Sequence, residues 1–298
     1  MKIHKNLKPV ISAVCLLLAA ILSFGYYLLN PVENSAEGNV SYYDYPFYVC
    51  FIDVGQGDCE LISCNGVNIL VDGGEAKYAG RVLNYLDSLG IEKLDCYIAT
   101  HPHSDHIGAS ASILSQIPCD NVFTTYFSEH NIPTSNTYES FLDAVYDSGA
   151  TAVAVEAGDE YKFGELTLKI FAPVTESDEY NDMSIVFSAE YKNASVLFTG
   201  DATKTVEKQI LSQGYDVSAD AIKIAHHGST SSNSEEFIEA VAPESAVISC
   251  GKDNSYGHPH REIINLLTLE EIEYYRTDIS GTIVYYSDGV SFNQEVAE

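Results

Sequence analysis

The sequence has few basic side chains. It contains 43 Asp and Glu residues but only 15 Lys and Arg, which gives the 298-residue chain a formal net charge of -28 at pH 7. Such a chain repels polyanions and anionic lipids at long range. The composition therefore argues against a protein that coats DNA or docks on a membrane through a basic face. The acidic composition is compatible with an enzyme that binds a phosphate through a metal ion, because the metal supplies the positive charge.

Paired cysteine motifs and sequence repeats are also absent. None of the 7 cysteines forms a Cys-x-x-Cys pair, which argues against a cysteine zinc site. Several lie in apolar stretches typical of strands, where cysteine behaves as a small buried residue, so free cysteines are favoured over a disulfide framework. No low-complexity tract and no repeat of solenoid period is found. With 46% apolar residues, the chain can bury a sizeable core.

One long apolar run is present, near the N-terminus. Lys2, Lys5 and Lys8 precede residues 10–29, which are uncharged and long enough to cross a bilayer. The pattern predicts a basic cytoplasmic flank at 1–9, a transmembrane anchor at 10–29 and a body outside the cytoplasm, on the cell membrane. A cleaved signal peptide, which would make the body secreted, is the alternative, although no clear cleavage site follows the run. The polar residues 30–45 predict a linker, and 46–298 a single folded domain.

The predicted domain mixes strands and helices throughout. Asn65-Gly66 predicts a hairpin turn between strands at 59–64 and 67–71, and Gly90 suits the end of a helix at 78–89. Further strands are expected at 48–54, 94–99, 122–126, 151–155, 166–171, 184–190, 195–199, 220–225, 245–249, 282–286 and 290–293. Helices are expected at 107–117, 138–146, 203–213, 234–241 and 260–269. This order favours a layered α/β architecture, with sheets covered by helices.

The most specific signal is a cluster of metal-ligand side chains at residues 100–106. His101, His103, Asp105 and His106 follow a predicted strand and precede a predicted helix. Imidazole nitrogens and carboxylate oxygens suit zinc, manganese or iron. The side chains of four ligands on so tight a turn point in different directions. We therefore expect two neighbouring ions, one held by His101 and His103 and the other by Asp105 and His106. A solvated histidine-rich loop is the alternative, and it does not account for this order after a strand.

Later strands are followed by further candidates. Asp201 comes directly after a buried strand and a glycine, which suits a carboxylate bridging two ions or, alternatively, a helix N-cap. His226 and His227 follow the strand at 220–225, where alternation favours His226 as the ligand of the second ion. Asp72 ends another strand and is expected either to orient a ligand histidine or to serve as a turn residue.

Three more residues lie near the expected mouth of the site. His258, between Gly257 and Pro259, is expected to donate a proton to the leaving oxygen or to bind a phosphate; a loop histidine fixed by its neighbours is the alternative. Lys223 and Lys252 are rare positive charges that either steady an anion at the rim or form salt bridges in so acidic a chain.

Motifs over about residues 48–290 resemble the metallo-β-lactamase fold and, within it, the ComEC-type competence proteins. They read FIDVGQGDCELI, ILVDGG, THPHSDHIGA, NDMSIVF, LFTGDA, IKIAHHGST and SYGHPH. The resemblance implies a metal-dependent hydrolase with a four-layer αββα sandwich, here preceded by one N-terminal transmembrane helix. By analogy, the metal ligands are His101, His103, Asp105, His106, Asp201 and His226, with Asp72 as a supporting carboxylate. We expect Asp105, Asp201 and His258 to be the catalytic residues and His227 to lie beside the pocket.

The sequence departs from this family pattern at one place. Many enzymes of the fold have another histidine between the first cluster and the bridging aspartate. Here that region reads Asn181-Asp182-Met183-Ser184, and the only histidine between positions 106 and 201 is His130. The first ion would then keep His101, His103, Asp201 and water, and Asn181 or Asp182 is expected to line the pocket. The related choline-phosphate esterases resemble this pattern.

The resemblance implies a phosphodiesterase or nuclease with two divalent ions, zinc rather than manganese, and a metal-bound hydroxide as the attacking group. The substrate would be a small phosphodiester or single-stranded DNA, without tight non-specific nucleic-acid binding. A phosphorylcholine or wall-polymer esterase is the alternative, because a small diester suits the acidic chain better; hydrolysis of β-lactams ranks third. A non-catalytic metal-binding module of a DNA-uptake or envelope complex is an alternative of another class, against which the two adjacent sites argue.

Overall fold

The computed structural model describes residues 41–296. The predicted flank at 1–9, the anchor at 10–29 and residues 30–40 of the linker lie outside this range. Among the residues that are described, no helix combines the length and the apolarity needed to cross a membrane. The end of the predicted linker differs from expectation, because the 3-10 helix η1 (Tyr42–Asp44) buries Tyr42, whose hydroxyl lies 3.1 Å from that of Tyr85. The compact domain therefore begins at Tyr42 rather than at Pro46.

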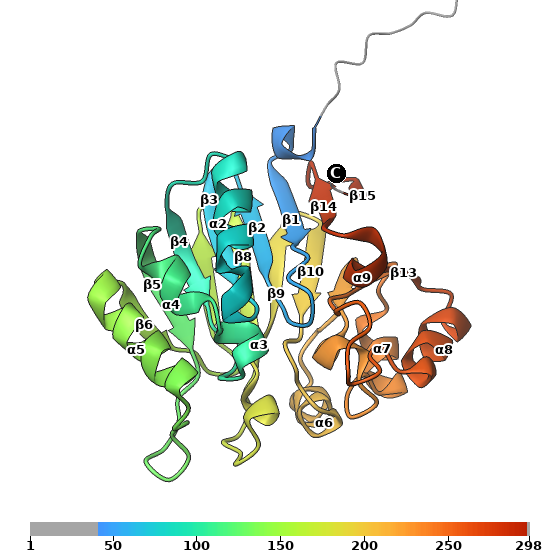
Figure 1. Ribbon diagram of the computed structural model, residues 1–298. Helices are drawn as coiled ribbons and strands as arrows, with labels where there is room; N and C mark the ends of the chain where they lie inside the picture. The colour runs from blue at the N-terminus through green and yellow to red at the C-terminus, as the bar shows by residue number, and fades with distance from the viewer. Residues whose placement is uncertain (1–40, 297–298) are drawn as a thin grey trace, which may run out of the picture. The chain divides into compact units, whose positions relative to one another are not determined.

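Two sheets form the centre of the domain (Figure 1). Within the described range, the first has eight strands in the order β15-β14-β1-β2-β3-β4-β5-β6 and the second has seven in the order β13-β12-β11-β10-β9-β8-β7. The first sheet consists of β1 (Phe47–Phe51), β2 (Glu60–Cys64), β3 (Val67–Val71), β4 (Leu94–Ile98), β5 (Cys119–Thr124), β6 (Thr151–Ala154), β14 (Ile283–Ser287) and β15 (Phe292–Val296). The second consists of β7 (Glu160–Phe163), β8 (Leu166–Ala172), β9 (Val186–Tyr191), β10 (Ala194–Phe198), β11 (Ala221–Lys223), β12 (Ser245–Ile248) and β13 (Glu273–Arg276).

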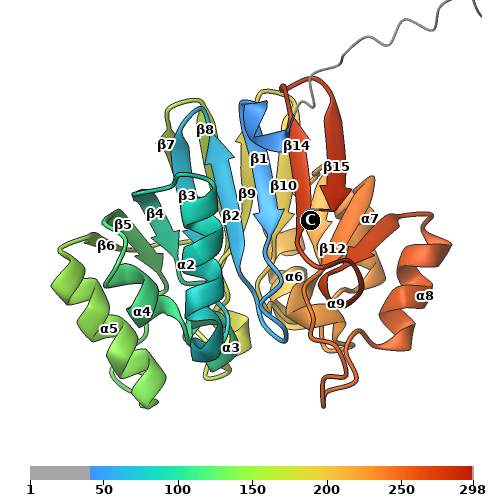
Figure 2. The same ribbon diagram turned by 45° about the horizontal axis from the view of Figure 1, so that its top comes forward.

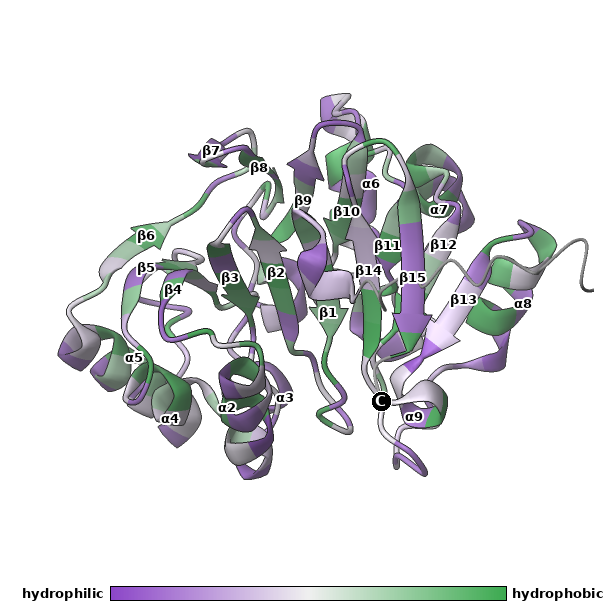
Figure 3. Cartoon of the chain, turned by 90° about the horizontal axis from the view of Figure 1, so that it is seen from above, coloured by the Kyte–Doolittle hydropathy of each residue, from purple (hydrophilic) through white to green (hydrophobic). Residues whose placement is uncertain are grey.

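Helices cover the outer face of each sheet (Figure 2). On the first sheet, apolar residues of α2 (Ala79–Ser88), α4 (Ser110–Leu114) and α5 (Asn136–Ser148) join one buried cluster. On the second, α6 (Lys204–Gln213), α7 (Glu235–Val241) and α8 (Arg261–Leu269) contribute to another. In Figure 3, several of these helices show mixed surfaces of hydrophobic and hydrophilic residues, as expected for helices with one face buried. The predicted four-layer αββα sandwich is therefore confirmed.

A third apolar cluster fills the space between the sheets. Phe51 of β1 stacks on Phe198 of β10 with ring centroids 6.0 Å apart, and Phe187 of β9 stacks on Phe198 at 4.8 Å. All three rings are buried. Aromatic pairs of this kind contribute beyond the area that they bury. The interface therefore holds the two sheets in one fixed relation, on which the position of the site depends.

Two features differ from the sequence expectation. The helix expected at 107–117 is two short helices, α3 (Ser104–Ile107) and α4. The helical hydrogen bonds are interrupted because the Ala109 amide donates to the Gly74 carbonyl oxygen, while the Asp105 carbonyl oxygen accepts from the Asp58 amide. Strands β7 and β13 were not anticipated. Both lie at sheet edges and expose part of their side chains, so they lack a clear apolar pattern. The six described cysteines, at positions 50, 59, 64, 96, 119 and 250, are free and buried, as expected.

The strand directions position the functional residues. Strands β3 to β6 run parallel to one another, and so do β10 to β13. Carboxyl ends of parallel strands meet at the same edge of a sheet. The loops after β3, β4, β10, β11 and β12 therefore open at one end of the sandwich, where α3 and α6 lie (Figure 1).

Candidate metal centre

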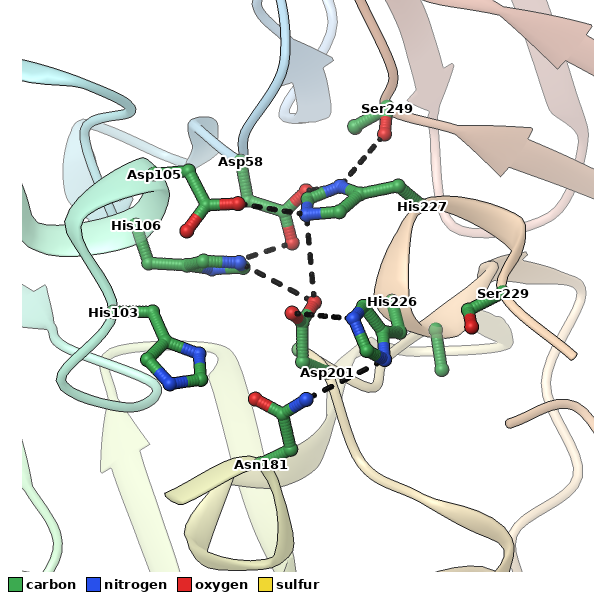
Figure 4. A network of polar contacts seen from close by, with 12 residues as sticks. Asp58, His103, Asp105, His106, Asn181, Asp201, His226, His227, Ser229 and Ser249 are labelled. Carbon is green, nitrogen blue, oxygen red and sulfur yellow. Dashed lines mark hydrogen bonds and ion pairs between the residues drawn. The ribbon is translucent and has the colours of Figure 1, made fainter. Parts of the chain in front are cut away.

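The structure brings the predicted ligand side chains together at this end of the sandwich. His101 and His103 follow β4, Asp105 and His106 lie on α3, and Asp201 follows β10. His226 and His227 lie in the 3-10 turn η4 (Ala225–Gly228) after β11. Each sheet thus contributes about half of the cluster, and the side chains converge on Asp201 (Figure 4).

Asp201 lies between two groups of nitrogen atoms. Its Oδ1 atom is 3.3 Å from His106 Nε2 and 3.7 Å from His227 Nε2. Its Oδ2 atom is 3.6 Å from His101 Nε2 and 3.7 Å from His226 Nε2. One carboxylate oxygen therefore faces each pair of histidines, which is the geometry required of a carboxylate that bridges two cations.

The remaining predicted ligands complete the two groups. His103 Nδ1 lies 3.1 Å from His101 Nε2, and Asp105 Oδ2 lies 3.3 Å from His227 Nε2. The buried atoms His106 Nε2, Asp201 Oδ1 and His227 Nε2 have no hydrogen-bond partner. Buried polar atoms are normally paired, so three unpaired atoms facing a common space fit a bound cation. The donor set of imidazoles and carboxylates fits zinc or manganese.

Asp72 has the position that a supporting carboxylate requires. Its Oδ2 atom lies 2.8 Å from His106 Nδ1, and its two oxygens accept hydrogen bonds from the backbone amide and the hydroxyl of Thr100. Because Nδ1 of His106 is engaged in this way, Nε2 is directed toward Asp201.

The two adjacent histidines both reach the centre, and they do so differently. The strand alternation that favours His226 does not extend to them, because β11 ends at Lys223 and both histidines have left-handed backbone angles, with φ of 51° and 54°. His227 is buried, and its Nδ1 atom lies 2.9 Å from the Ser249 carbonyl oxygen (Figure 4). His226 is partly exposed, and its Nδ1 atom lies 3.0 Å from the Ser231 hydroxyl.

A cavity of about 300 Å³ opens onto the cluster. It is lined by Gln56, His103, Ser104, Asp105, Asn181, Asp201, His226, His227, Tyr256 and His258. Asn181 therefore has the predicted position, but Asp182 does not line the cavity, because its carboxylate accepts hydrogen bonds from the hydroxyls of Thr203 and Ser177 instead. In the short helix Tyr180–Met183, adjacent side chains point to different sides.

His258 lies in the cavity wall with its Nδ1 atom buried and without a hydrogen-bond partner. Its ring is 5.6 Å from that of His226, centroid to centroid. Burial, together with the nearby His227 and His226, lowers the pKa of His258 to about 4. The imidazole is therefore neutral at pH 7.

The charges of the cluster are strongly interdependent. Burial opposes ionisation of Asp201, yet His106 and His227 hold its pKa well below the ordinary value. Burial likewise disfavours the charged form of His106, but Asp201, Asp58 and Asp72 raise its pKa well above the ordinary value. Burial and the neighbouring His106 lower the pKa of His101. The protein thus holds ionised carboxylates in a buried space, as a cation site requires.

Two residues lie directly behind the site: Asp58, which the sequence did not assign to it, and Lys223, which the sequence suggested either for the rim or for a salt bridge. Asp58, in the loop between β1 and β2, and Lys223, at the end of β11, are both buried, and Lys223 Nζ lies 2.5 Å from Asp58 Oδ2. Lys223 is thus a salt-bridge residue rather than a cation at the rim. A lysine within an apolar strand is the signal that indicates a buried partner, but nothing local identifies Asp58 as that partner.

Glu60 of β2 provides a test of the buried charge in this region. Its carboxyl group is buried, and burial and the adjacent Asp58 raise its pKa well above 4.5. In the unfolded chain the Glu60 carboxyl group ionises near pH 4.5, whereas in the folded chain it stays protonated. The free energy of unfolding therefore falls as the pH rises from 4.5 to the pKa of Glu60 in the folded chain. We expect Glu60→Gln to become progressively more stable than the parent over that interval, measured by urea unfolding of the metal-free proteins. A difference that does not change with pH would contradict this expectation.

Comparison with known proteins agrees with the fold. A family model described as the metallo-beta-lactamase superfamily matches residues 52–252. The chain is 30% identical over 270 residues to ComE operon protein 3 of Bacillus subtilis, covering 84% of this chain and 33% of that protein. It is 30% identical over 255 residues to Recombination protein 2 of Haemophilus influenzae, covering 83% and 29%. The chain thus spans about a third of the length of the curated relatives it matches.

Solved structures share the architecture at low sequence identity. Igni18, a metallo hydrolase from Ignicoccus hospitalis, has a TM-score of 0.55 and 16% identity over 80% of this chain and 99% of its own. YhfI of Bacillus subtilis, a metallo-beta-lactamase fold protein, has a TM-score of 0.53 and 13% identity over 77% and 96%. At these identities the likeness concerns the fold alone, whereas the family match covers most of the domain. The chain therefore belongs to the metallo-β-lactamase superfamily, with relatives among the competence proteins.

Proposed function

We propose that this protein is a metal-dependent hydrolase that cleaves phosphodiesters at a centre of two divalent ions, zinc in preference to manganese. The observation that carries the proposal is the position of Asp201, whose two carboxylate oxygens face separate groups of histidines. A structural metal site needs neither a second site nor an adjoining cavity. Here a cavity adjoins the cluster, and the donors fall into two groups around Asp201, which supports two catalytic ions.

The contacts divide the ligands into two sets. Asp201 Oδ2 would share one ion with His101, His103 and His226, and Asp201 Oδ1 would share the other with Asp105, His106 and His227. In this assignment His226 takes the place of the histidine that the sequence lacks before Asp201. Divalent ions, when bound, lower the pKa of water and neutralise charge on a phosphate.

Residues of the chain supply the remaining functions. Asp72 holds the His106 ring, and the Ser249 carbonyl holds that of His227. His258, neutral at pH 7, lines the cavity and would form a hydrogen bond to a phosphate oxygen or to the leaving group. Asn181 lines the cavity beside His226. The catalytic residues in this proposal are Asp105, Asp201 and His258.

The names of the relatives include Competence protein ComA of Neisseria gonorrhoeae, which supports a role in competence. For that role, single-stranded DNA is the substrate that we propose. The net charge of -28 favours the second candidate, a phosphorylcholine or wall-polymer esterase, because a small diester avoids long-range repulsion. We further propose that residues 10–29 anchor the chain in the cell membrane with the domain outside the cytoplasm, on the charge pattern of the sequence.

A panel of substrates tests the activity. Full-length protein, loaded with zinc or manganese, would be assayed with bis(p-nitrophenyl) phosphate, p-nitrophenylphosphorylcholine and labelled single-stranded DNA. We expect hydrolysis of at least one diester and its loss in His103→Ala, which removes a ligand that lines the cavity. Equal rates for the parent and His103→Ala would contradict catalysis and favour the non-catalytic module.

A further inference from the structure

A buried ion pair joins the two sheets behind the metal centre. Lys223 comes from β11 of the second sheet, and Asp58 from the β1–β2 loop of the first. Each side chain is 1% exposed, and Nζ and Oδ2 are 2.5 Å apart. The ammonium group also donates hydrogen bonds to the carbonyl oxygens of Gly200 and Ile224, at 3.2 and 3.3 Å. Lys223 is thus fixed at several points, and it fixes Asp58 in turn.

Asp58 contacts two of the proposed ligands of the second ion. Its Oδ1 atom lies 3.3 Å from His227 Nδ1, and its Oδ2 atom lies 3.6 Å from His106 Nδ1. These are the ring nitrogens that face away from Asp201 (Figure 4). Its backbone amide donates to the Asp105 carbonyl oxygen at 3.1 Å, and the preceding Gly57 packs so closely that a Cβ atom there would lie 2.2 Å from the same oxygen.

The position of the ammonium group explains why this triad is not itself a cation site. Asp58, His106 and His227 offer atoms close enough together to hold an ion. However, Lys223 already provides a positive charge at Asp58, and the two Nδ1 atoms are directed to Asp72 and to the Ser249 carbonyl. Without Lys223, the Asp58 carboxylate would be buried without a full charge partner, which proteins tolerate poorly.

We propose that Asp58, held by Lys223, is a positioning residue. Together with the Ser249 carbonyl it fixes the His227 ring, and together with Asp72 it fixes the His106 ring, so that both Nε2 atoms face the second ion. A carboxylate on the outer nitrogen of a ligand histidine fixes its orientation and makes it a stronger ligand. The inference rests on the proposed two-ion centre. According to this inference, one loop, residues 57–58, aligns His106, which follows a strand of the first sheet, with His227, which follows a strand of the second.

The test compares metal binding in four full-length proteins. These are the parent, Asp58→Asn, the double variant Asp58→Asn/Lys223→Gln, and Glu60→Gln as the matched control, which removes a neighbouring buried carboxyl group. Zinc affinity is measured by competition with a chromophoric chelator, and ligand geometry by the visible spectrum of the cobalt-loaded protein. We expect Asp58→Asn to weaken one of the two ions by about 10- to 100-fold and to change the cobalt spectrum, while Glu60→Gln matches the parent.

The double variant keeps the test decisive if Asp58→Asn does not fold, as judged by circular dichroism. It removes both charges at nearly constant volume, and we expect it to fold and still bind one ion at least tenfold more weakly. Parental affinity and spectrum in a folded Asp58 variant would overturn the inference. Failure of the parent itself to bind two ions would instead overturn the proposed function, so the two failures are distinguishable.

Discussion

Replacing Asp201 with alanine is expected to reduce hydrolysis by several orders of magnitude while the domain still folds. Asp201 lies within 3.7 Å of a ring nitrogen of each of four histidines, at positions 101, 106, 226 and 227, so its removal takes a ligand from both proposed ions at once. The side chain follows β10 and lies outside the apolar core between the sheets, which leaves the packing of the sandwich intact. Rates with bis(p-nitrophenyl) phosphate and metal content by elemental analysis provide the measurement.

Asp182→Ala is the matched control for this experiment. It removes an aspartate that the sequence suggests for the pocket and that the structure places outside the cavity, bonded to Ser177 and Thr203. We expect this variant to retain most of the activity. Near-normal turnover by Asp201→Ala with a full metal complement would remove Asp201 from the mechanism.

The second large effect is expected at His227. His227→Gln should leave one ion per chain and lower activity by several orders of magnitude, because this buried ring contacts both Asp105 and Asp201 and is fixed by the Ser249 carbonyl. His226→Gln should cost less, about 10- to 100-fold, because the ring is 24% exposed and water can replace it as a ligand.

A comparison of the two variants shows directly which histidine contributes more to metal binding and turnover. Elemental analysis counts the ions retained by each variant, and turnover with one diester ranks the losses. A larger loss in His226→Gln than in His227→Gln would reverse the assignment of the ligands and would restore the preference that strand alternation suggests.

Local sequence patterns predicted most of the architecture and the cluster at residues 101–106. A hairpin at Asn65-Gly66 and a run of ligand types after a strand are short-range signals, and the structure has both where they were expected. The relation between His226 and His227 was not predictable in this way. It depends on the end of β11 at Lys223 and on a left-handed turn that the periodicity of a strand does not describe.

The role of Asp58 could not be predicted from the sequence for a different reason. Its contacts with Lys223 and His227 join residues far apart in the chain and on opposite sheets, so no local pattern reports them. The edge strands β7 and β13 illustrate the same limit, because a partly exposed strand buries too few side chains to leave an apolar signature.

The metal ligands and the residues at the entrance of the cavity lie in different parts of the fold, which has an evolutionary consequence. The donors follow the ends of the central strands, whereas Tyr256 and Asn181 reach the cavity from the connecting segments. Replacements in those segments can reshape the entrance while the donors keep their alignment. A lineage can therefore exchange one substrate for another by altering the rim, while the metal ligands are inherited unchanged.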